Sequence, residues 1–340
     1  LQRMLEELLG PVDFERLPED GPVALARLKA SRPRLAFLST RLRLIEATTV
    51  LRAIPPARAG QVVLVVPDTL EGYRAAWDGL YFGARDFVVT RGLPAQRFKG
   101  GTAVRGRQLA HLLTDGTETD GAGAVPGFDG AWRVESACGV VALPGESTGG
   151  WSADGSSEQA RGSDGVQVEL PEKSPWVILA ESRHLPAVAA WLRFVPPAAP
   201  VLLRVPEGPR LQRVVREGLS RLLCHPVRIV RDGDRLVPGH VHLAHDAEAP
   251  VIVEAGGFLR VHLVPVAEAP GSWGAQRSAL RRLGSSPVPL RLILPGASCV
   301  ELEEFAAFAG DRHACFRLRR GEAGRGSAEP EAEVVAPRSA

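Results

Sequence analysis

Residues 1–91 alternate between two hydrophobic patterns. Apolar residues that recur every three or four positions predict helices, and short continuous apolar runs predict strands that are buried on both faces. Strands that alternate with helices predict an open α/β domain with a parallel sheet. The helices are expected at residues 1–9, 23–30, 46–54 and 72–82, and the strands at 34–38, 62–66 and 86–89.

The same alternation returns at residue 174 and predicts a second α/β domain over residues 174–320, with a doubly wound parallel sheet. Its strands are expected at 176–180, 201–205, 290–294 and 315–319, and its helices at 185–194, 211–223, 273–283 and 300–308. The Gly-, Glu- and Ala-rich tail, residues 321–340, is expected to be disordered.

Periodicity is lost over residues 92–173, where Gly, Ser, Thr and Asp dominate. A stretch of this length without a pattern predicts a linker between the two domains. One part of it, residues 132–143, has enough apolar residues to form one or two strands.

The segment 227–246 combines alternating apolar residues with two turn dipeptides, Asp232-Gly233 and Pro238-Gly239. Val227 and Ile229 precede the turns, while Val241 and Leu243 follow them. This arrangement predicts two strands joined as a hairpin.

Composition narrows the classes of protein that fit. The chain has 41 basic and 39 acidic residues, so its net charge of +2 is not that of a nucleic-acid-binding polyelectrolyte. Arginine supplies almost all of the basic charge, and the sequence shows no clustered arginine face for phosphate binding. We therefore expect no nucleic-acid partner.

The four cysteines are far apart and form no C-x-x-C pair, which argues against a zinc or redox motif. No cofactor and no metal are expected. The sequence shows no signal peptide and no apolar run of about 20 residues, so we expect a soluble cytoplasmic protein without membrane insertion. The chain begins at Leu1 inside a helical pattern, which suggests a fragment or a processed form.

The order Asp-Gly-Asp-Arg-Leu-x-Pro-Gly-His-Val-x-x-Ala, residues 232–244, resembles a segment of the chemotaxis protein-glutamate methylesterases, the CheB family. The resemblance implies a flavodoxin-like receiver-type domain, here 1–91, followed by a methylesterase domain. Members of this family hydrolyse glutamate methyl esters on chemoreceptors, and often deamidate glutamine, with a Ser-His-Asp arrangement.

Two serines compete for the nucleophile position that the resemblance implies. Ser182 follows the predicted strand 176–180 and precedes a predicted helix, in the family's order, although His184 and Leu185 replace the expected glycines. Ser147 stands in Glu-Ser-Thr-Gly-Gly, which has the right letters but lies in the predicted linker. Ser182 is the better candidate for a catalytic serine.

The other two triad positions do not carry the expected residues. Arg204, in Leu-Arg-Val-Pro, occupies the histidine position, and Val300 occupies the aspartate position. An arginine is effectively always charged and cannot act as a base at neutral pH, while a valine cannot orient an imidazole. The sequence therefore predicts impaired catalysis.

Histidines elsewhere in the domain leave two alternatives open. A substitute base for Ser182 could come from His184, His225, His240, His242 or His245. The pair His240-x-His242, with His245 and Asp246, could instead bind zinc.

The first domain resembles a response-regulator receiver in the strands 62–66 and 84–89 and the helix between them. Receivers accept a phosphoryl group on an aspartate, hold magnesium with an acidic pair on the first strand, and contact the phosphate through a lysine. Here Ser39 is at the phosphoacceptor position, Pro67 at the hydroxyl position and Thr90 at the lysine position, and the acidic pair is not found.

These replacements favour a methylesterase-like chemosensory regulator that acts by binding chemoreceptors or other chemosensory proteins. The alternative is an active methylesterase or glutamine deamidase that uses Ser182 with a divergent base. A decayed product without function is the third possibility.

Overall fold

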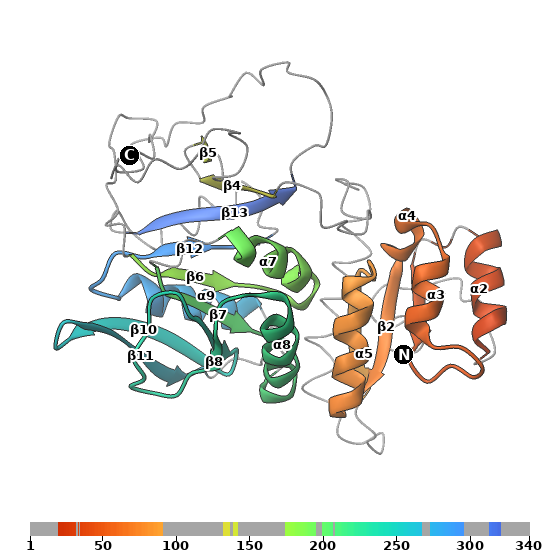
Figure 1. The fold of residues 1–340 in the computed structure, drawn as a ribbon, viewed down its shortest axis with the longest axis horizontal. Coiled ribbons are helices and arrows are strands. Elements are labelled where there is room, and N and C mark those ends of the chain that lie inside the picture. Colours follow the sequence, from red (N-terminus) through yellow and green to blue (C-terminus); the bar gives the residue numbers. More distant parts are fainter. Residues whose placement is uncertain are drawn as a thin grey trace. The chain divides into compact units, whose positions relative to one another are not determined.

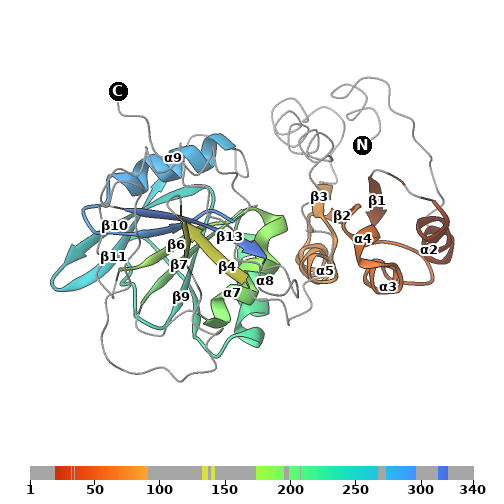
Figure 2. The same cartoon turned by 90° about the horizontal axis from the view of Figure 1, so that it is seen from above.

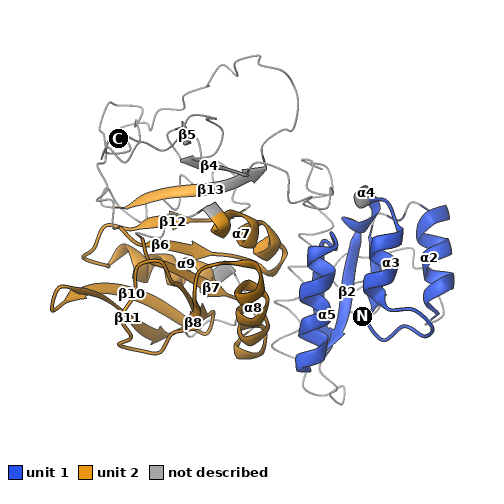
Figure 3. Cartoon of the chain, in the orientation of Figure 1, with its two compact units in different colours: residues 1–127 blue, residues 128–340 orange. Residues whose placement is uncertain are grey.

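The computed structural model describes residues 20–90 (apart from 32 and 34), 132–136, 139–141, 174–194, 199–206, 208–266, 273–295 and 313–320. The chain divides into two compact units, residues 1–127 and 128–340 (Figure 3). Both units are built on parallel strands with helices between them, which confirms the predicted α/β class. In the described part of the chain, no helix has the length and hydrophobicity needed to span a membrane.

The first unit contains a three-stranded parallel sheet in the order β1-β2-β3 (Figure 1). The predicted elements of 23–89 are confirmed, with small shifts at their ends, whereas the predicted helix 1–9 lies outside the described residues. The strands are β1 (Ala36–Ser39), β2 (Val62–Pro67) and β3 (Asp86–Thr90), and the helices are α2 (Gly21–Ala30), α3 (Ala47–Ala53), α4 (Pro56–Ala59) and α5 (Leu70–Tyr81).

Two glycines allow α5 to pack closely on β2. A Cβ atom at Gly72 would lie 2.2 Å from the Pro67 carbonyl oxygen, and one at Gly79 would lie 2.0 Å from Leu64 Cδ1. These separations are far below van der Waals contact, so larger residues would push the helix away from the strand. The two glycines are seven residues apart and therefore face the sheet on the same side of the helix.

The second unit contains an eight-stranded sheet in the order β5-β4-β13-β12-β6-β7-β9-β8 (Figure 1). The strands from β13 to β8 are all parallel, and β4 and β5 join antiparallel at one edge. The bounds are β4 (Trp132–Ser136), β5 (Gly139–Val141), β6 (Trp176–Leu179), β7 (Val201–Val205), β8 (Val227–Ile229), β9 (Val241–His245), β12 (Arg291–Ile293) and β13 (Ala314–Arg320).

Strands β4 and β5 come from the stretch predicted to be a linker, and they confirm the expectation of strands near 132–143. Because β4 pairs with β13, this part of the chain belongs to the sheet of the second unit. The remaining limits proposed for the linker, and the tail 321–340, stay predictions.

Helices cover both faces of the large sheet (Figure 2). On one side lie α7 (Leu185–Trp191), which a short 3₁₀ turn (Leu192–Phe194) continues, and α8 (Pro209–Leu222). On the other side lie α9 (Trp273–Gly284) and a hairpin of β10 (Glu248–Ala255) and β11 (Phe258–Pro265). Residues from α9, the hairpin and the parallel strands share one buried core: Val177, Leu202, Ala244, Ile252, Val261, Leu280, Leu283 and Leu292.

The hairpin predicted for residues 227–246 is wrong. β8 and β9 are neighbours, but they run parallel, with Val227 opposite Val241. The hairpin of this unit is β10–β11, which turns at Gly256 and Gly257 with positive φ values of 62° and 74°. Such angles favour glycine, so Gly-Gly between two alternating runs was the signal for this hairpin.

The connection between β8 and β9 lies along the outer edge of β11. The Gly233 N–H donates to the Val261 carbonyl (2.8 Å), the Val261 N–H donates to the Asp234 carbonyl (2.9 Å), and the Leu236 N–H donates to the Leu259 carbonyl (2.8 Å). The turn residues therefore do not close a hairpin between β8 and β9. They attach residues 233–236 to β11.

A buried serine ties the hairpin to the chain after α9. The Ile252 N–H donates to Ser286 Oγ (3.0 Å), and both residues are fully buried. We predict that Ser286→Ala lowers the free energy of unfolding by about 1–3 kcal/mol, because the buried N–H loses its acceptor. Chemical denaturation measures this, and the neighbouring exposed Ser285→Ala is the matched control. Equal stability of the two variants would contradict the assignment.

Candidate functional site

The carboxyl ends of the parallel strands in the second unit form the candidate site. From β6 the chain continues to β7 on one side, and it later returns to place β12 on the other side of β6. In open parallel sheets, ligands bind at such a reversal of strand order, outside the carboxyl ends of the strands. The residues that directly follow β6 are therefore the first to consider.

Ser182 lies at this reversal. It opens a 3₁₀ turn (Ser182–His184) that leads into α7, so the predicted order of strand, serine and helix is confirmed. Glu181 and Arg183 flank it and form an ion pair, with Arg183 Nε 2.8 Å from Glu181 Oε2. Among the described residues, no imidazole is hydrogen-bonded to the Ser182 hydroxyl.

Arg204 lies inside β7, opposite Leu179 of β6 and Ala244 of β9, and is only 3% exposed. Its Nε donates to the Glu248 carbonyl (3.1 Å), and an Nη nitrogen donates to the Asp246 carbonyl. Burial lowers the pKa of Arg204 to about 10, against the opposing effect of the Asp246 carboxylate. The guanidinium thus stays charged at neutral pH and holds the turn between β9 and β10.

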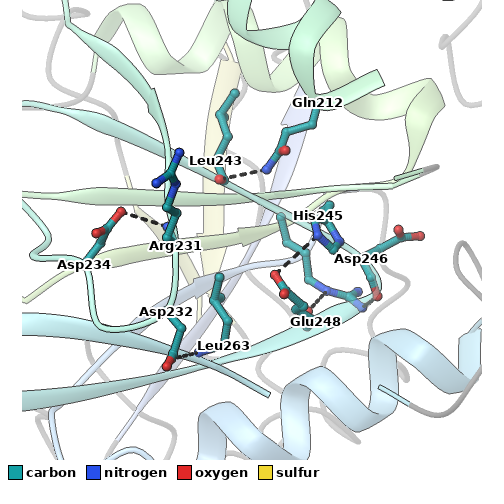
Figure 4. A network of polar contacts seen from close by, with 10 residues as sticks. Gln212, Arg231, Asp232, Asp234, Leu243, His245, Asp246, Glu248 and Leu263 are labelled. Carbon is teal, nitrogen blue, oxygen red and sulfur yellow. Dashed lines mark hydrogen bonds and ion pairs between the residues drawn. The ribbon is translucent and has the colours of Figure 1, made fainter. Parts of the chain in front are cut away.

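This turn carries the other charged groups near the carboxyl end of β9. Asp246 is 2% exposed, and His245 Nε2 lies 3.4 Å from Glu248 Oε2 (Figure 4). A buried carboxylate beside a buried arginine is stabilised mainly by its partner and by hydrogen bonds. The group at the histidine position therefore belongs to an ionic cluster that supports the turn.

His242 is occupied by the fold. Its Nε2 accepts a hydrogen bond from the Val237 N–H (3.2 Å), which places the proton on Nδ1, and this atom donates to the Val201 carbonyl (3.1 Å). Burial lowers the pKa of His242 to about 4, so the ring is neutral near pH 7. With both ring nitrogens occupied, His242 is available neither as a base nor as a metal ligand.

The proposed zinc site is contradicted within the described residues. No group of three or more His, Cys, Asp or Glu side chains there could hold a metal ion. His240 and His242 do lie near one another, with ring centroids 6.0 Å apart, but His245 is paired with Glu248. These histidines are close in sequence, but their side chains do not converge on one point.

His184 is the histidine nearest to Ser182 in sequence. Burial and, to a smaller extent, the adjacent Arg183 guanidinium lower the pKa of His184 to about 4. Its ring is therefore neutral near pH 7, and its Nδ1 is buried without a hydrogen-bond partner among the described residues. Val300, at the aspartate position, and Ser147 lie outside the described residues.

Sequence reasoning missed the role of the two aspartates in Asp232-Gly233-Asp234. Asp232 Oδ1 accepts a hydrogen bond from the Leu263 N–H of β11 (2.8 Å), and Asp234 Oδ2 accepts one from the Arg231 N–H (2.8 Å), as Figure 4 shows. The Leu263 N–H, more than any other group, holds the pKa of Asp232 below its ordinary value. The segment 232–244, which carries the family resemblance, is thus hydrogen-bonded to β11 of the β10–β11 hairpin.

In the first unit, Ser39, Pro67 and Thr90 end the three parallel strands and so lie at one edge of the sheet. Ser39 Oγ accepts a hydrogen bond from the Arg41 N–H (3.1 Å), and Thr90 Oγ1 donates to the Val66 carbonyl (3.1 Å). The edge therefore presents a hydroxyl where a receiver needs a carboxylate nucleophile. Both hydroxyls make local contacts with the main chain.

No protein-family model and no curated protein sequence matches this chain. Among solved structures, the catalytic domain of the CheB methylesterase from Thermotoga maritima aligns with it at 14% identity and a TM-score of 0.33. The alignment covers 41% of this chain and 78% of that domain. This is a distant structural resemblance over part of the chain.

We predict that Arg204→Met lowers the free energy of unfolding by about 3–5 kcal/mol, because the buried Asp246 carboxylate and two carbonyls lose their cationic partner. Thermal and urea unfolding measure the loss. Arg231→Met, at an exposed position, is the matched control and should change stability little. If Arg204→Met unfolds at the same temperature and urea concentration as the wild type, the structural role of Arg204 is contradicted.

The lowered pKa of His242 predicts a pH dependence of stability. The unfolded histidine takes up a proton near its ordinary pKa of 6.5, before the folded one does near 4. Stability is therefore full above pH 6.5 and falls as the pH drops toward 4, by up to about 3 kcal/mol from this residue.

Urea unfolding between pH 6.5 and pH 5 measures this slope, and His242→Gln is expected to flatten it. His225→Gln, in the turn before β8, is the matched control and should keep the slope. An unchanged slope in His242→Gln would mean that His242 is not the responsible group.

Proposed function

We propose that this protein is a methylesterase-like chemosensory regulator of the cytoplasm that acts by binding rather than by hydrolysis. The observation that carries the proposal is the position of Arg204. A serine at the end of β6 needs a base within hydrogen-bond reach, and the residue at that position on the next strand is a buried cation. Its nitrogens donate to main-chain carbonyls that the fold needs to satisfy. Because the guanidinium stays charged at neutral pH, it cannot accept the serine proton.

The first unit supports the same proposal. A hydroxyl at Ser39 cannot form the acyl phosphate that an aspartate forms at the phosphoacceptor position, and so phosphorylation of the usual kind cannot switch the protein. A regulator that lacks both the phosphoryl switch and the esterase base retains the ability to bind. The partners that fit are chemoreceptors or other chemosensory proteins.

The alternative is an esterase or deamidase that uses Ser182 with His184 as a divergent base. One observation favours it: Ser182 lies at the reversal of strand order. The ring of His184 is neutral at pH 7, but a pKa of about 4 makes it a weak proton acceptor. Without the histidine and aspartate of the family, a triad of this kind loses several orders of magnitude in rate.

Methanol release from methylated chemoreceptors separates the two functions. We expect the full chain to release no more methanol than Ser182→Ala, and a serine-directed fluorophosphonate to leave Ser182 unlabelled. Turnover that disappears in both Ser182→Ala and His184→Gln, together with an adduct at Ser182, would establish the enzyme instead.

Binding is measured in parallel with the purified cytoplasmic part of the receptor. Wild type and Ser182→Ala should bind it equally, because no step of the proposed function uses the hydroxyl. A receptor preparation known to be hydrolysed by an intact family member is the positive control. Absence of both turnover and receptor binding would contradict the chemosensory proposal.

A further inference from the structure

The outward face of α8 carries a cluster of arginines. The inward face of this helix is apolar and almost fully buried, with Leu211, Val214, Val215 and Leu219 no more than 2% exposed. The helical period places four arginines on the opposite face, and all four are exposed: Arg210, Arg213, Arg216 and Arg221. The term arginine face refers below to these four residues. It corrects the expectation that the arginines of this chain do not cluster.

The helix that carries the arginine face is held firmly on the sheet. Gln212, itself 3% exposed, donates from Nε2 to the Leu243 carbonyl of β9 (2.9 Å), as Figure 4 shows. Pro209 occupies the first turn, and the Leu223 N–H closes the last turn on the Leu219 carbonyl (2.9 Å). The arginines therefore project from a fixed backbone, which reduces the entropy lost on binding.

Three of the four arginines on this face have no acidic partner within the described part of the chain. Glu217 is the only acidic residue in α8, and Arg213, Arg216 and Arg221 form no ion pair with any described residue. At about 1.5 Å per residue, Arg210 and Arg221 are about 16 Å apart along the axis. Their guanidinium groups offer planar forks that match carboxylates.

We propose that the arginine face is a docking surface for an acidic helical segment of a partner protein. Carboxylates three and four residues apart on such a helix would meet the arginines along α8, since both rows follow the same helical period. This deepens the proposed function by assigning the chemistry of the partner to one face.

Charge complementarity selects this occupant over the alternatives. A row of exposed arginines along one helix is complementary to carboxylates spaced along another. The exposed positions of α8 include no large apolar side chain of the kind that inserts into a membrane surface. The described part of the first unit is itself basic, with eight Lys or Arg and six Asp or Glu between residues 20 and 90.

The test titrates the full chain into a fluorescently labelled helical peptide of about 20 residues with glutamates three and four positions apart. The same peptide with glutamine in place of glutamate is the control ligand. Arg213→Gln/Arg216→Gln should weaken binding about tenfold, because two charge-assisted contacts are lost. Arg41→Gln/Arg43→Gln, which removes two exposed arginines of the first unit, should bind like wild type.

Each result has a defined meaning. Binding of the acidic peptide should weaken as the salt concentration rises. No binding of the peptide, equal loss in the two double variants, or tighter binding of single-stranded DNA or anionic vesicles than of the peptide would overturn the proposal. The peptide titration reads neither esterase activity nor receptor binding, so its failure is distinguishable from failure of the proposed function.

Discussion

The second unit depends on how it accommodates one positive charge within an apolar strand. Arg204 occupies the interior of β7, where its neighbours in the strand are valine and leucine, and it is almost completely buried. An uncompensated charge there would cost several kcal/mol. The carbonyls of Asp246 and Glu248 and the carboxylate of Asp246 provide the compensation. These contacts determine where β9 ends and where the β10–β11 hairpin begins.

The same interaction limits what Arg204 can contribute to the candidate site. The donors of Arg204 are hydrogen-bonded to the Glu248 and Asp246 carbonyls, so this side chain contributes structure and no base. His242 also has a structural role, because both of its ring nitrogens are hydrogen-bonded to the main chain. Arg204 and His242 thus hold the sheet and its connections.

The segment 232–244 shows how a sequence pattern can be recognised while its structural role is misassigned. Asp-Gly and Pro-Gly are turn signals, and flanking alternation is the usual mark of a hairpin. The strands on either side are parallel, however, because the connection crosses to β11 and bonds to it through residues 233–236. Asp232 and Asp234 stabilise the connection between β8 and β9 through hydrogen bonds to main-chain N–H groups. The residues that carry the resemblance therefore have a structural role here.

Local patterns by themselves determined most of the elements. The continuous apolar run at 62–66 predicted a strand buried on both faces, as did the run at 201–205, which only Arg204 interrupts. The apolar stripe of α8 predicted a helix with one buried side. Identity alone also excluded a base at Arg204 and a phosphoacceptor carboxylate at Ser39. Tertiary structure decided which strands pair and in which direction, as β8–β9 and β4–β13 show. It also decided that His240, His242 and His245 do not converge on a metal. Pairing and convergence depend on contacts between residues distant along the chain, and no local pattern encodes them.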